Sequence, residues 1–389
     1  MIYLDNNATT KLSSAARAAM EPWLGEEFGN PSAGYRSGKR ARSAISEARE
    51  QVAALVGALP EEITFTSGGT ESTTSIIESA CRTWPDKKVL LSSSVEHSAV
   101  HETMQCLSEL IVSTHRVNTI NSKGELDLDE WREHLTEDVA IASLIWANNE
   151  TGVLSPIEAA GRLAFDQKVL FHTDAVQAVG KIPIDLKELP IHSLSISAHK
   201  FYGPKGVGAL YVRTGVPFQP LIRGGGQESD RRSGTENVAS IVAMGVAARE
   251  AAERLKAESQ LSELRDRLEK QIIEKVEGVE INGDPTNRLP NTSNLFFSGV
   301  DGEGLLILLD EAGVCCSPGS ACSTGAVKPS RILLAMGHDS KRARSSVRFS
   351  LSHMTTAAEI DSAVEAIAQA VGKLRITIDT SRSPVRRNR

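Results

Sequence analysis

The chain has 389 residues, of which 40% are hydrophobic and 24% charged, and its formal net charge is -6 at pH 7. This length is too great for one small core and predicts two or so domains, and the composition excludes a disordered or fibrous protein. The acidic balance gives no global field that attracts nucleic acid, so direct nucleic-acid binding is not expected. The one basic cluster, the arginine-rich tail 381–389, is interpreted as a solvated terminus.

The five cysteines have no framework spacing, which indicates free thiols in a reducing compartment. No pair of Cys or His residues has structural-zinc spacing, so no metal is predicted. The first residues lack the basic and apolar regions of a signal peptide, and no apolar run approaches membrane-spanning length. We therefore expect a cytoplasmic protein that does not bind membranes.

Short apolar runs alternate with helix-sized segments between residues 60 and 215. This alternation predicts crossover connections and a mostly parallel sheet covered on both faces, the arrangement of an α/β domain. The expected strands cover residues 62–66, 88–92, 139–146, 168–172, 192–196 and 207–212.

The pattern changes after residue 247. A charged, amphipathic stretch predicts one long helix over 247–276 that bridges two lobes. Shorter elements follow and predict a smaller α+β domain. We expect strands over 294–297, 314–317 and 346–351, and helices over 302–311 and 356–374.

A glycine-containing turn follows the first expected strand. In Ser67-Gly-Gly-Thr70 the glycines let backbone amides face an anion, and the N-terminus of the next helix adds a favourable partial charge. The turn lacks the lysine of a P-loop and the full dinucleotide fingerprint. The segment is therefore equally compatible with two interpretations: a phosphate-binding turn, or a tight turn in which Thr70 caps the helix.

Two further strand ends carry ionisable groups. Asp174 lies just past the strand 168–172, where a buried carboxylate needs a cation such as a protonated pyridine nitrogen; it is equally compatible with a helix N-cap. Lys200 follows the strand 192–196, where an amine can hold an aldehyde cofactor as a Schiff base. A lone lysine beside a Gly-Pro turn is usually a surface group. The convergence of three strand ends favours a site.

Three other side chains are candidates. His97 follows a strand, so its ring can lie over a planar cofactor and move protons, although an isolated histidine is more often part of a core. Asn149 can hydrogen-bond a ring substituent or a substrate carboxylate, or simply occupy a turn. Arg348 projects from the polar face of a strand and can clamp a carboxylate or form a surface ion pair.

Cys322 differs from the other cysteines because small and turn-forming residues flank it in Ser317-Pro-Gly-Ser-Ala-Cys-Ser-Thr-Gly325. Such a segment packs poorly and is predicted to be mobile. A mobile thiol can reach a substrate inside a cleft and an acceptor outside it, once it is deprotonated. Cys81 and Cys106 are interpreted as buried hydrophobic residues.

Together these segments resemble the pyridoxal-phosphate-dependent cysteine desulfurases of the iron-sulfur-cluster and nitrogen-fixation type, in the class V aminotransferase family. The resemblance includes Tyr3-Leu-Asp-Asn-Asn-Ala-Thr-Thr10 and Phe28-Gly-Asn-Pro-Ser32, and it covers most of the chain. It implies an aminotransferase-like (fold type I) large domain over 11–255. Residues 1–10 and 256–389 would form the small domain, with a mobile cysteine loop at about 316–328.

The resemblance also implies roles for individual residues. Lys200 would bind pyridoxal 5'-phosphate and move the Cα proton, with His97 stacked on the ring and assisting proton transfer. Asn149, Arg348 and Asn30 would bind the substrate. Cys322 would take the sulfur of L-cysteine, leaving L-alanine and an enzyme persulfide. The further cofactor-binding residues would be Gly69, Thr70, Asn149, Asp174, Gln177, Ser197, His199 and, from the partner subunit of a homodimer, the partner's Thr235.

Three departures from the family pattern, the first of them Cys315-Cys-Ser-Pro318 where a serine pair is more common, remove no catalytic group. His353 stands where an arginine is expected, and the tail differs from the segment with which housekeeping members dock a cluster scaffold. The sulfur acceptor can therefore belong to any of three pathways: iron-sulfur cluster assembly, tRNA thiolation or sulfur modification of DNA. Cluster assembly is favoured as the most common use.

Three alternative functions remain. A selenocysteine lyase or an aminotransferase can be built on the same fold, and an aminotransferase has no need of Cys322. A cofactor-binding scaffold or sulfur relay without catalysis is less compatible with the joint presence of Lys200, His97, Asp174 and Cys322.

Overall fold

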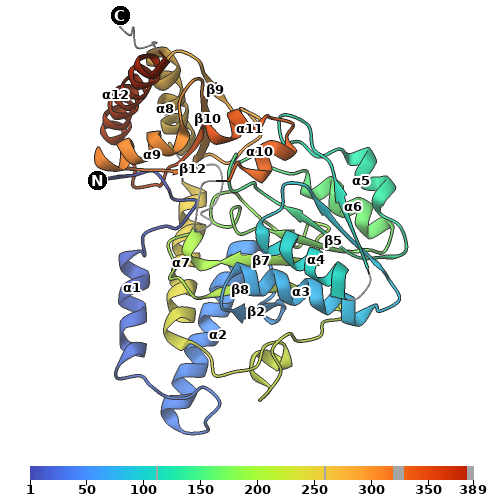
Figure 1. Cartoon of the computed structure of the whole chain (residues 1–389). Coiled ribbons are helices and arrows are strands. Elements are labelled where there is room, and N and C mark those ends of the chain that lie inside the picture. Colours follow the sequence, from blue (N-terminus) through green and yellow to red (C-terminus); the bar gives the residue numbers. More distant parts are fainter. Residues whose placement is uncertain (111–112, 258–259, 319–327, 383–389) are drawn as a thin grey trace, which may run out of the picture.

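The computed structural model describes residues 1–110, 113–257, 260–318 and 328–382 (Figure 1). The strands of this part of the chain form a seven-stranded, a four-stranded and a two-stranded sheet. The larger sheet has seven strands in the order β2-β8-β7-β6-β5-β3-β4. All neighbouring pairs are parallel except those of β8, which runs antiparallel to β2 and β7. The strands are β2 (Ile63–Thr66), β3 (Val89–Ser93), β4 (Thr114–Asn118), β5 (Val139–Ile145), β6 (Leu170–Asp174), β7 (Ser193–Ser197) and β8 (Gly208–Val212).

Helices cover both faces of this sheet, which confirms the predicted α/β architecture. Successive strand residues point to opposite faces, so Leu90 packs in one apolar cluster with α3 and α4, and Leu91 in another with α2 and α7. The helices around this sheet are α1 (Ser14–Met20), α2 (Arg36–Val56), α3 (Gly69–Thr83), α4 (Ser98–Leu110), α5 (Leu128–His134), α6 (Ile157–Asp166) and α7 (Val238–Lys256). Short 3-10 turns are η1 (Glu21–Leu24), η2 (Pro60–Glu62), η3 (Ala198–Lys200) and η4 (Gln227–Asp230).

The second sheet is antiparallel, in the order β12-β13-β10-β9, and packs against helices in the upper part of Figure 1. The N-terminal strand β1 pairs with β11, and Leu4 is fully buried in the apolar core of this region. The elements are β1 (Ile2–Tyr3), α8 (Leu261–Lys275), β9 (Val279–Ile281), β10 (Thr292–Phe297), α9 (Gly302–Glu311), β11 (Val314–Cys315), β12 (Ser317–Pro318), α10 (Arg331–Ala335), α11 (Ser340–Arg344), β13 (Ser346–Ser350) and α12 (Ala357–Arg382). The domain boundaries near residues 10 and 255 stay a prediction.

The long helix expected over 247–276 is wrong in one respect: the structure has two helices, α7 and α8. Ala247 and Ala251 of α7 lie in the core under the large sheet, whereas Leu268 and Ile272 of α8 lie in the core of the second sheet. One straight helix cannot bury its apolar stripe in both cores, so α7 ends at Lys256 and Ala257 is extended. The strand expected over 314–317 is likewise divided, because β11 and β12 belong to different sheets.

Strand β4 was not predicted. It is the edge strand of the large sheet and carries the polar residues Thr114, His115 and Arg116, most of them at least partly exposed. An edge strand needs no continuous apolar run, so the pattern used for the buried strands does not detect it.

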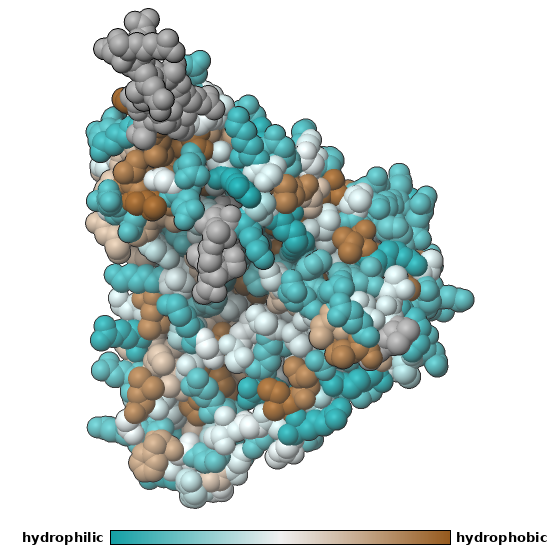
Figure 2. Space-filling model, in the orientation of Figure 1, coloured by the Kyte–Doolittle hydropathy of each residue, from teal (hydrophilic) through white to brown (hydrophobic). Residues whose placement is uncertain are grey.

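The surface facing the viewer in Figure 2 mixes hydrophilic and hydrophobic residues, and the hydrophobic ones stand in several separate places. Large apolar side chains that are exposed include Leu24, Phe28 and Tyr35, in the connection between α1 and α2. Among the described residues, no helix combines the length and apolar character needed to cross a membrane.

Candidate active site

A cavity of about 440 Å³ opens where the central strands of the large sheet end. Asp174 is the last residue of β6, Ser197 is the last residue of β7, and both line the cavity. The parallel strands thus deliver their terminal residues to one place, as open α/β sheets do. The predicted site residues that line it are Gly69, Thr70, His97, Asn149, Asp174, Gln177, Ser197, His199, Lys200 and Arg348.

Three predicted residues are not brought to this cavity by the described chain. Asn30 is exposed near the start of α2, and its Oδ1 accepts the backbone N–H of Ser32 at 2.9 Å. Thr235 is also exposed and does not line its own chain's cavity. Cys322 lies outside the described residues.

The amine of Lys200 points at the N-terminal segment of the chain. Its Nζ donates to the carbonyl oxygens of Asn7 at 2.6 Å and Ala8 at 2.8 Å. Burial and, next, the positive charge of Arg348 lower the pKa of Lys200 to about 8. The negative charges of Asp174 and Asp5 oppose this shift. Lowering the pKa of Lys200 increases the fraction of neutral amine, the form that acts as a nucleophile or base.

Asp174 is a buried carboxylate whose described neighbours do not include an ion-pair partner. It is 5% exposed, and Oδ1 accepts the backbone N–H of Val176 at 3.0 Å. Burial raises the pKa of Asp174, while the nearby charge of His97 acts in the opposite direction. A carboxylate held in this way at a cavity wall fits a cationic ring nitrogen, which would stabilise its charged form.

At the end of the cavity near α3, the backbone is open enough for a ligand to come close to it. A Cβ on Gly69 would lie 2.6 Å from Cγ2 of Val176, so only glycine leaves this wall open. Gly69 and Thr70 form the first turn of a 15-residue helix, whose leading amides have no partner within the helix. His199 is largely neutral because burial, then the charge of Lys200, lower its pKa to about 4. This end of the cavity fits a phosphate group.

His97 lies at the mouth of the cavity, and its ring orientation follows from a local contact. Its Nδ1 accepts the backbone N–H of Ala99 at 3.1 Å, which leaves the proton of the neutral ring on Nε2. The preceding residue, Glu96, is fully buried and accepts from Ser93 Oγ at 2.6 Å and from the backbone N–H of Ile145 at 2.9 Å. Burial raises the pKa of Glu96 to about 8. Glu96 therefore ties the turn that carries His97 to β5.

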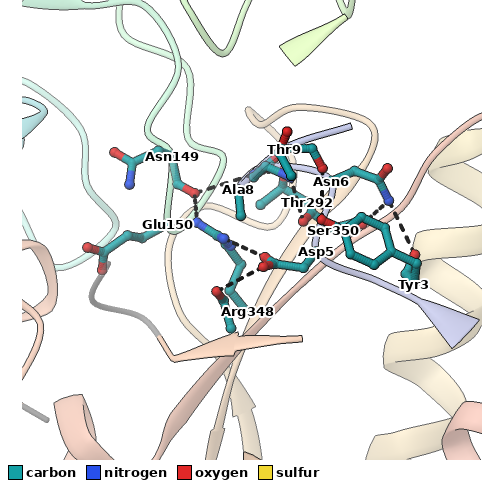
Figure 3. A network of polar contacts seen from close by, with 12 residues as sticks. Tyr3, Asp5, Asn6, Ala8, Thr9, Asn149, Glu150, Thr292, Arg348 and Ser350 are labelled. Carbon is teal, nitrogen blue, oxygen red and sulfur yellow. Dashed lines mark hydrogen bonds and ion pairs between the residues drawn. The ribbon is translucent and has the colours of Figure 1, made fainter. Parts of the chain in front are cut away.

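Arg348 reaches the cavity from β13 and is held by two groups (Figure 3). Its Nη1 donates to the carbonyl oxygen of Asn149 at 2.8 Å, and its Nη2 pairs with Oδ1 of Asp5 at 2.6 Å. Nε is buried and has no hydrogen-bond partner among the described residues. The predicted carboxylate clamp thus already holds a carboxylate from its own chain.

Sequence reasoning missed three residues of the site because their partners are far apart in the chain. Asp5 and Asn7 line the cavity, and the carbonyl oxygen of Asn7 accepts from Lys200 and from Gln177 Nε2. Lys181 Nζ donates to Gln177 Oε1 at 2.5 Å and to Asn7 Oδ1 at 2.9 Å. The spacing of four residues between Gln177 and Lys181 was a usable signal, because such pairs meet on one turn. Asp5 and Asn7 lie in the segment Tyr3-Leu-Asp-Asn-Asn-Ala-Thr-Thr10 that contributes to the family resemblance, but no role was predicted for either.

Comparison with known proteins identifies the family of the chain. The family model "Aminotransferase class-V" matches residues 2–363. The chain is 46% identical to cysteine desulfurase NifS of Azotobacter vinelandii over 376 residues, covering 96% of this chain and 93% of that protein. It is 49% identical to a cysteine desulfurase of Cereibacter sphaeroides, with 96% of each chain covered.

Solved structures show the same fold. A NifS-like protein superposes with a TM-score of 0.90 at 36% identity, covering 96% of this chain and all of that one. SspA in complex with cysteine superposes with a TM-score of 0.81 at 35% identity, covering 90% of this chain and 99% of that one.

The fold and the site define a pyridoxal-phosphate-dependent enzyme with the aminotransferase-like fold. The chain belongs to the aminotransferase class-V family, and its relatives place it among the cysteine desulfurases of that family. The resemblance, the fold type and the cofactor inferred from the sequence are thereby confirmed.

Proposed function

We propose that this enzyme converts L-cysteine to L-alanine and leaves the sulfur as a persulfide on Cys322. In this reaction the carbon–sulfur bond of the substrate breaks and a sulfur–sulfur bond to Cys322 forms, while a proton is delivered to the substrate carbon. The observation that carries the proposal is the single cavity that gathers Lys200, His97, Asp174 and Arg348. Pyridoxal phosphate, when bound, supplies an electron sink that weakens the bonds around the substrate Cα.

The chain's own residues have distinct tasks in this proposal. Lys200 anchors the cofactor and moves the proton at Cα, and its lowered pKa suits both tasks. Asp174 would hold the ring nitrogen in its protonated form. His97 would cover the ring and handle a proton at Nε2. Gln177 would contact the ring hydroxyl. The phosphate would be held by Gly69, Thr70, Ser197 and His199, which all line the cavity.

The substrate carboxylate is assigned to Arg348 and Asn149, with Asn30 as a further contact. Cys322 is five residues beyond Ser317, which lines the cavity. The solved structure of SspA was determined in complex with cysteine, which supports cysteine as the substrate here.

The decisive experiment is mass spectrometry of the cofactor-loaded protein after exposure to L-cysteine. We expect one added sulfur on the peptide that carries Cys322, and loss of both that sulfur and alanine release in Cys322→Ala. Cys106→Ala is the matched control. The prediction that Cys106 is buried is wrong: this cysteine of α4 is exposed, and it does not line the cavity. Alanine release from L-cysteine that survives Cys322→Ala would exclude the proposed mechanism.

The same preparation separates the alternative functions. An aminotransferase would transfer the amino group to a keto acid and would tolerate the loss of Cys322. A selenocysteine lyase would turn over selenocysteine much faster than cysteine. We expect cysteine turnover that depends on Cys322 and no amino-group transfer.

The remaining assignments concern the cellular setting. We propose a cytoplasmic homodimer that passes the persulfide sulfur to an acceptor protein, with iron-sulfur cluster assembly as the expected destination. The cysteines in the described part of the chain are free thiols, which supports a reducing compartment. The exposed position of Thr235 supports a dimer in which the partner subunit's Thr235 completes the phosphate site.

A further inference from the structure

Arg348 has only one carboxylate partner among the described residues, and that partner is Asp5. The Asp5 Oδ1 lies 2.6 Å from Nη2, and the side chains of Arg348 and Asp5 are 7% and 17% exposed. Both residues line the cavity proposed to bind the cofactor and the substrate. The pair is therefore a partly buried ion pair at the place where a substrate carboxylate is expected.

Asp5 is held at this place by the fold rather than by Arg348 alone. It forms a parallel bridge with Ser350, the last residue of β13, and its Oδ2 accepts from Ser317 Oγ of β12 at 3.2 Å. Figure 3 shows its carboxylate turned toward the guanidinium of Arg348. The two oxygens thus have separate tasks, one toward Arg348 and one toward β12.

Arg348 has an anchor of its own that does not involve Asp5. Its Nη1 donates to the carbonyl oxygen of Asn149, and the strand around it pairs with β10 through Asn294. The hydrogen bond to Asn149 can therefore keep the guanidinium in position when its ion pair with Asp5 breaks. A free carboxylate of the substrate and the side chain of Asp5 offer the same acceptor atoms to the same donor.

We propose that Asp5 competes with the amino-acid substrate for Arg348. Without substrate, the Asp5 carboxylate pairs with the Arg348 guanidinium. When the substrate binds, its carboxylate replaces that of Asp5. This inference rests on the proposed function, in which Arg348 binds that carboxylate. The competition weakens the binding of substrate and product alike. Its benefit is in turnover, since the return of Asp5 to Arg348 helps to release L-alanine, which keeps the carboxylate after its sulfur has gone.

Electrostatics gives the direction of the effect. Asp5 carries a negative charge beside the guanidinium, so it both occupies a donor and repels a second carboxylate. Replacing it with a neutral amide of the same shape leaves the positive charge of Arg348 uncompensated. Asp5→Asn should therefore bind L-alanine more tightly, by about fivefold for a competing pair worth about 1 kcal/mol.

The test measures the dissociation constant of L-alanine for the cofactor-loaded enzyme by calorimetry, together with KM and kcat for L-cysteine. We expect Asp5→Asn to lower both the dissociation constant and KM by about fivefold. Asp5→Glu, which keeps the charge, should stay close to the original enzyme. Asp361→Asn is the matched control, because Asp361 pairs with Arg267 on an exposed surface, and it should change neither constant.

Three results would overturn the inference. Weaker alanine binding in Asp5→Asn would mean that Asp5 supports the site rather than competes with the ligand. An equal gain in Asp5→Asn/Arg348→Gln relative to Arg348→Gln would mean that the effect does not pass through Arg348. Unchanged alanine binding in Arg348→Gln alone would remove the proposed carboxylate site and, with it, the competitor. A damaged fold cannot imitate the expected result, because it would weaken binding.

Discussion

Burial and the positive charge of Arg348 lower the pKa of the Lys200 amine, which is proposed to bind the cofactor. Its pKa is lowered to about 8, so the amine is protonated below that pH and neutral above it. Only the neutral amine attacks an aldehyde. The rate at which the cofactor-free protein acquires the visible absorbance of bound pyridoxal phosphate should therefore rise with pH and level off above about 8.

The neighbouring charge provides the control for this pH profile. Arg348 is the second cause of the lowered pKa of Lys200, so Arg348→Gln should move the midpoint to higher pH. A stopped-flow series from pH 6 to 10 on both proteins measures this shift. A midpoint near the ordinary lysine value of about 10.4 in the original protein would contradict the tuning.

At the scale of elements, β8 packs closely against the turn before α3, where the phosphate of the cofactor is proposed to bind. A Cβ on Gly208 would lie 2.5 Å from the carbonyl oxygen of Ile196 and 2.6 Å from Cα of Gly68. Both obstacles are backbone atoms, which cannot rotate away as a side chain would. Gly208→Ala must therefore push the turn and the start of α3 out of position.

We expect Gly208→Ala to weaken the affinity for pyridoxal phosphate about tenfold, the equivalent of about 1.4 kcal/mol. Equilibrium dialysis of the cofactor measures this loss. Gly372→Ala is the matched control, because Gly372 lies inside α12, where alanine is favoured, and a Cβ there meets no atom within 4 Å. Unchanged affinity in Gly208→Ala would show that this contact does not shape the phosphate site.

At the scale of the whole molecule, the proposed homodimer makes a prediction that one chain alone cannot satisfy. Thr235 is exposed and does not line its own chain's cavity, so each site would take Lys200 from one subunit and the partner's Thr235. Thr235→Val should lower cofactor affinity, and Lys200→Ala should abolish the covalent attachment. In a mixed dimer, both changes fall in one site and the other site is intact.

Mixing the two variants after mild dissociation should therefore restore tight cofactor binding to about half of the sites in mixed dimers. Visible absorbance of the re-formed dimer measures this recovery, and each variant treated alone is the control. If mixing gives no recovery although mixed dimers form, Thr235 does not complete the site of the other subunit.

Much of the fold and site was predictable from local patterns. The buried strands β2, β3, β5, β6, β7 and β8 coincide with the expected strands to within a few residues, because a short run of apolar residues, continuous or alternating, bounded by turn signals indicates a buried strand. Asp174 and Lys200 were found for a related reason: both directly follow such a run, and the ends of parallel strands meet at one edge. Helix α9 was also predicted, because the helical spacing of its apolar residues is contained in the ten residues Gly302–Glu311.

The sequence by itself thus determined which groups carry chemistry and which family they belong to, because those signals are contained in short segments. Only the tertiary structure decided that Asp5 meets Arg348 across 343 residues of chain, that Asn7 joins Lys200 to Gln177, and that the long amphipathic stretch divides into α7 and α8. These outcomes depend on contacts between distant segments, for which neither periodicity nor turn chemistry carries information.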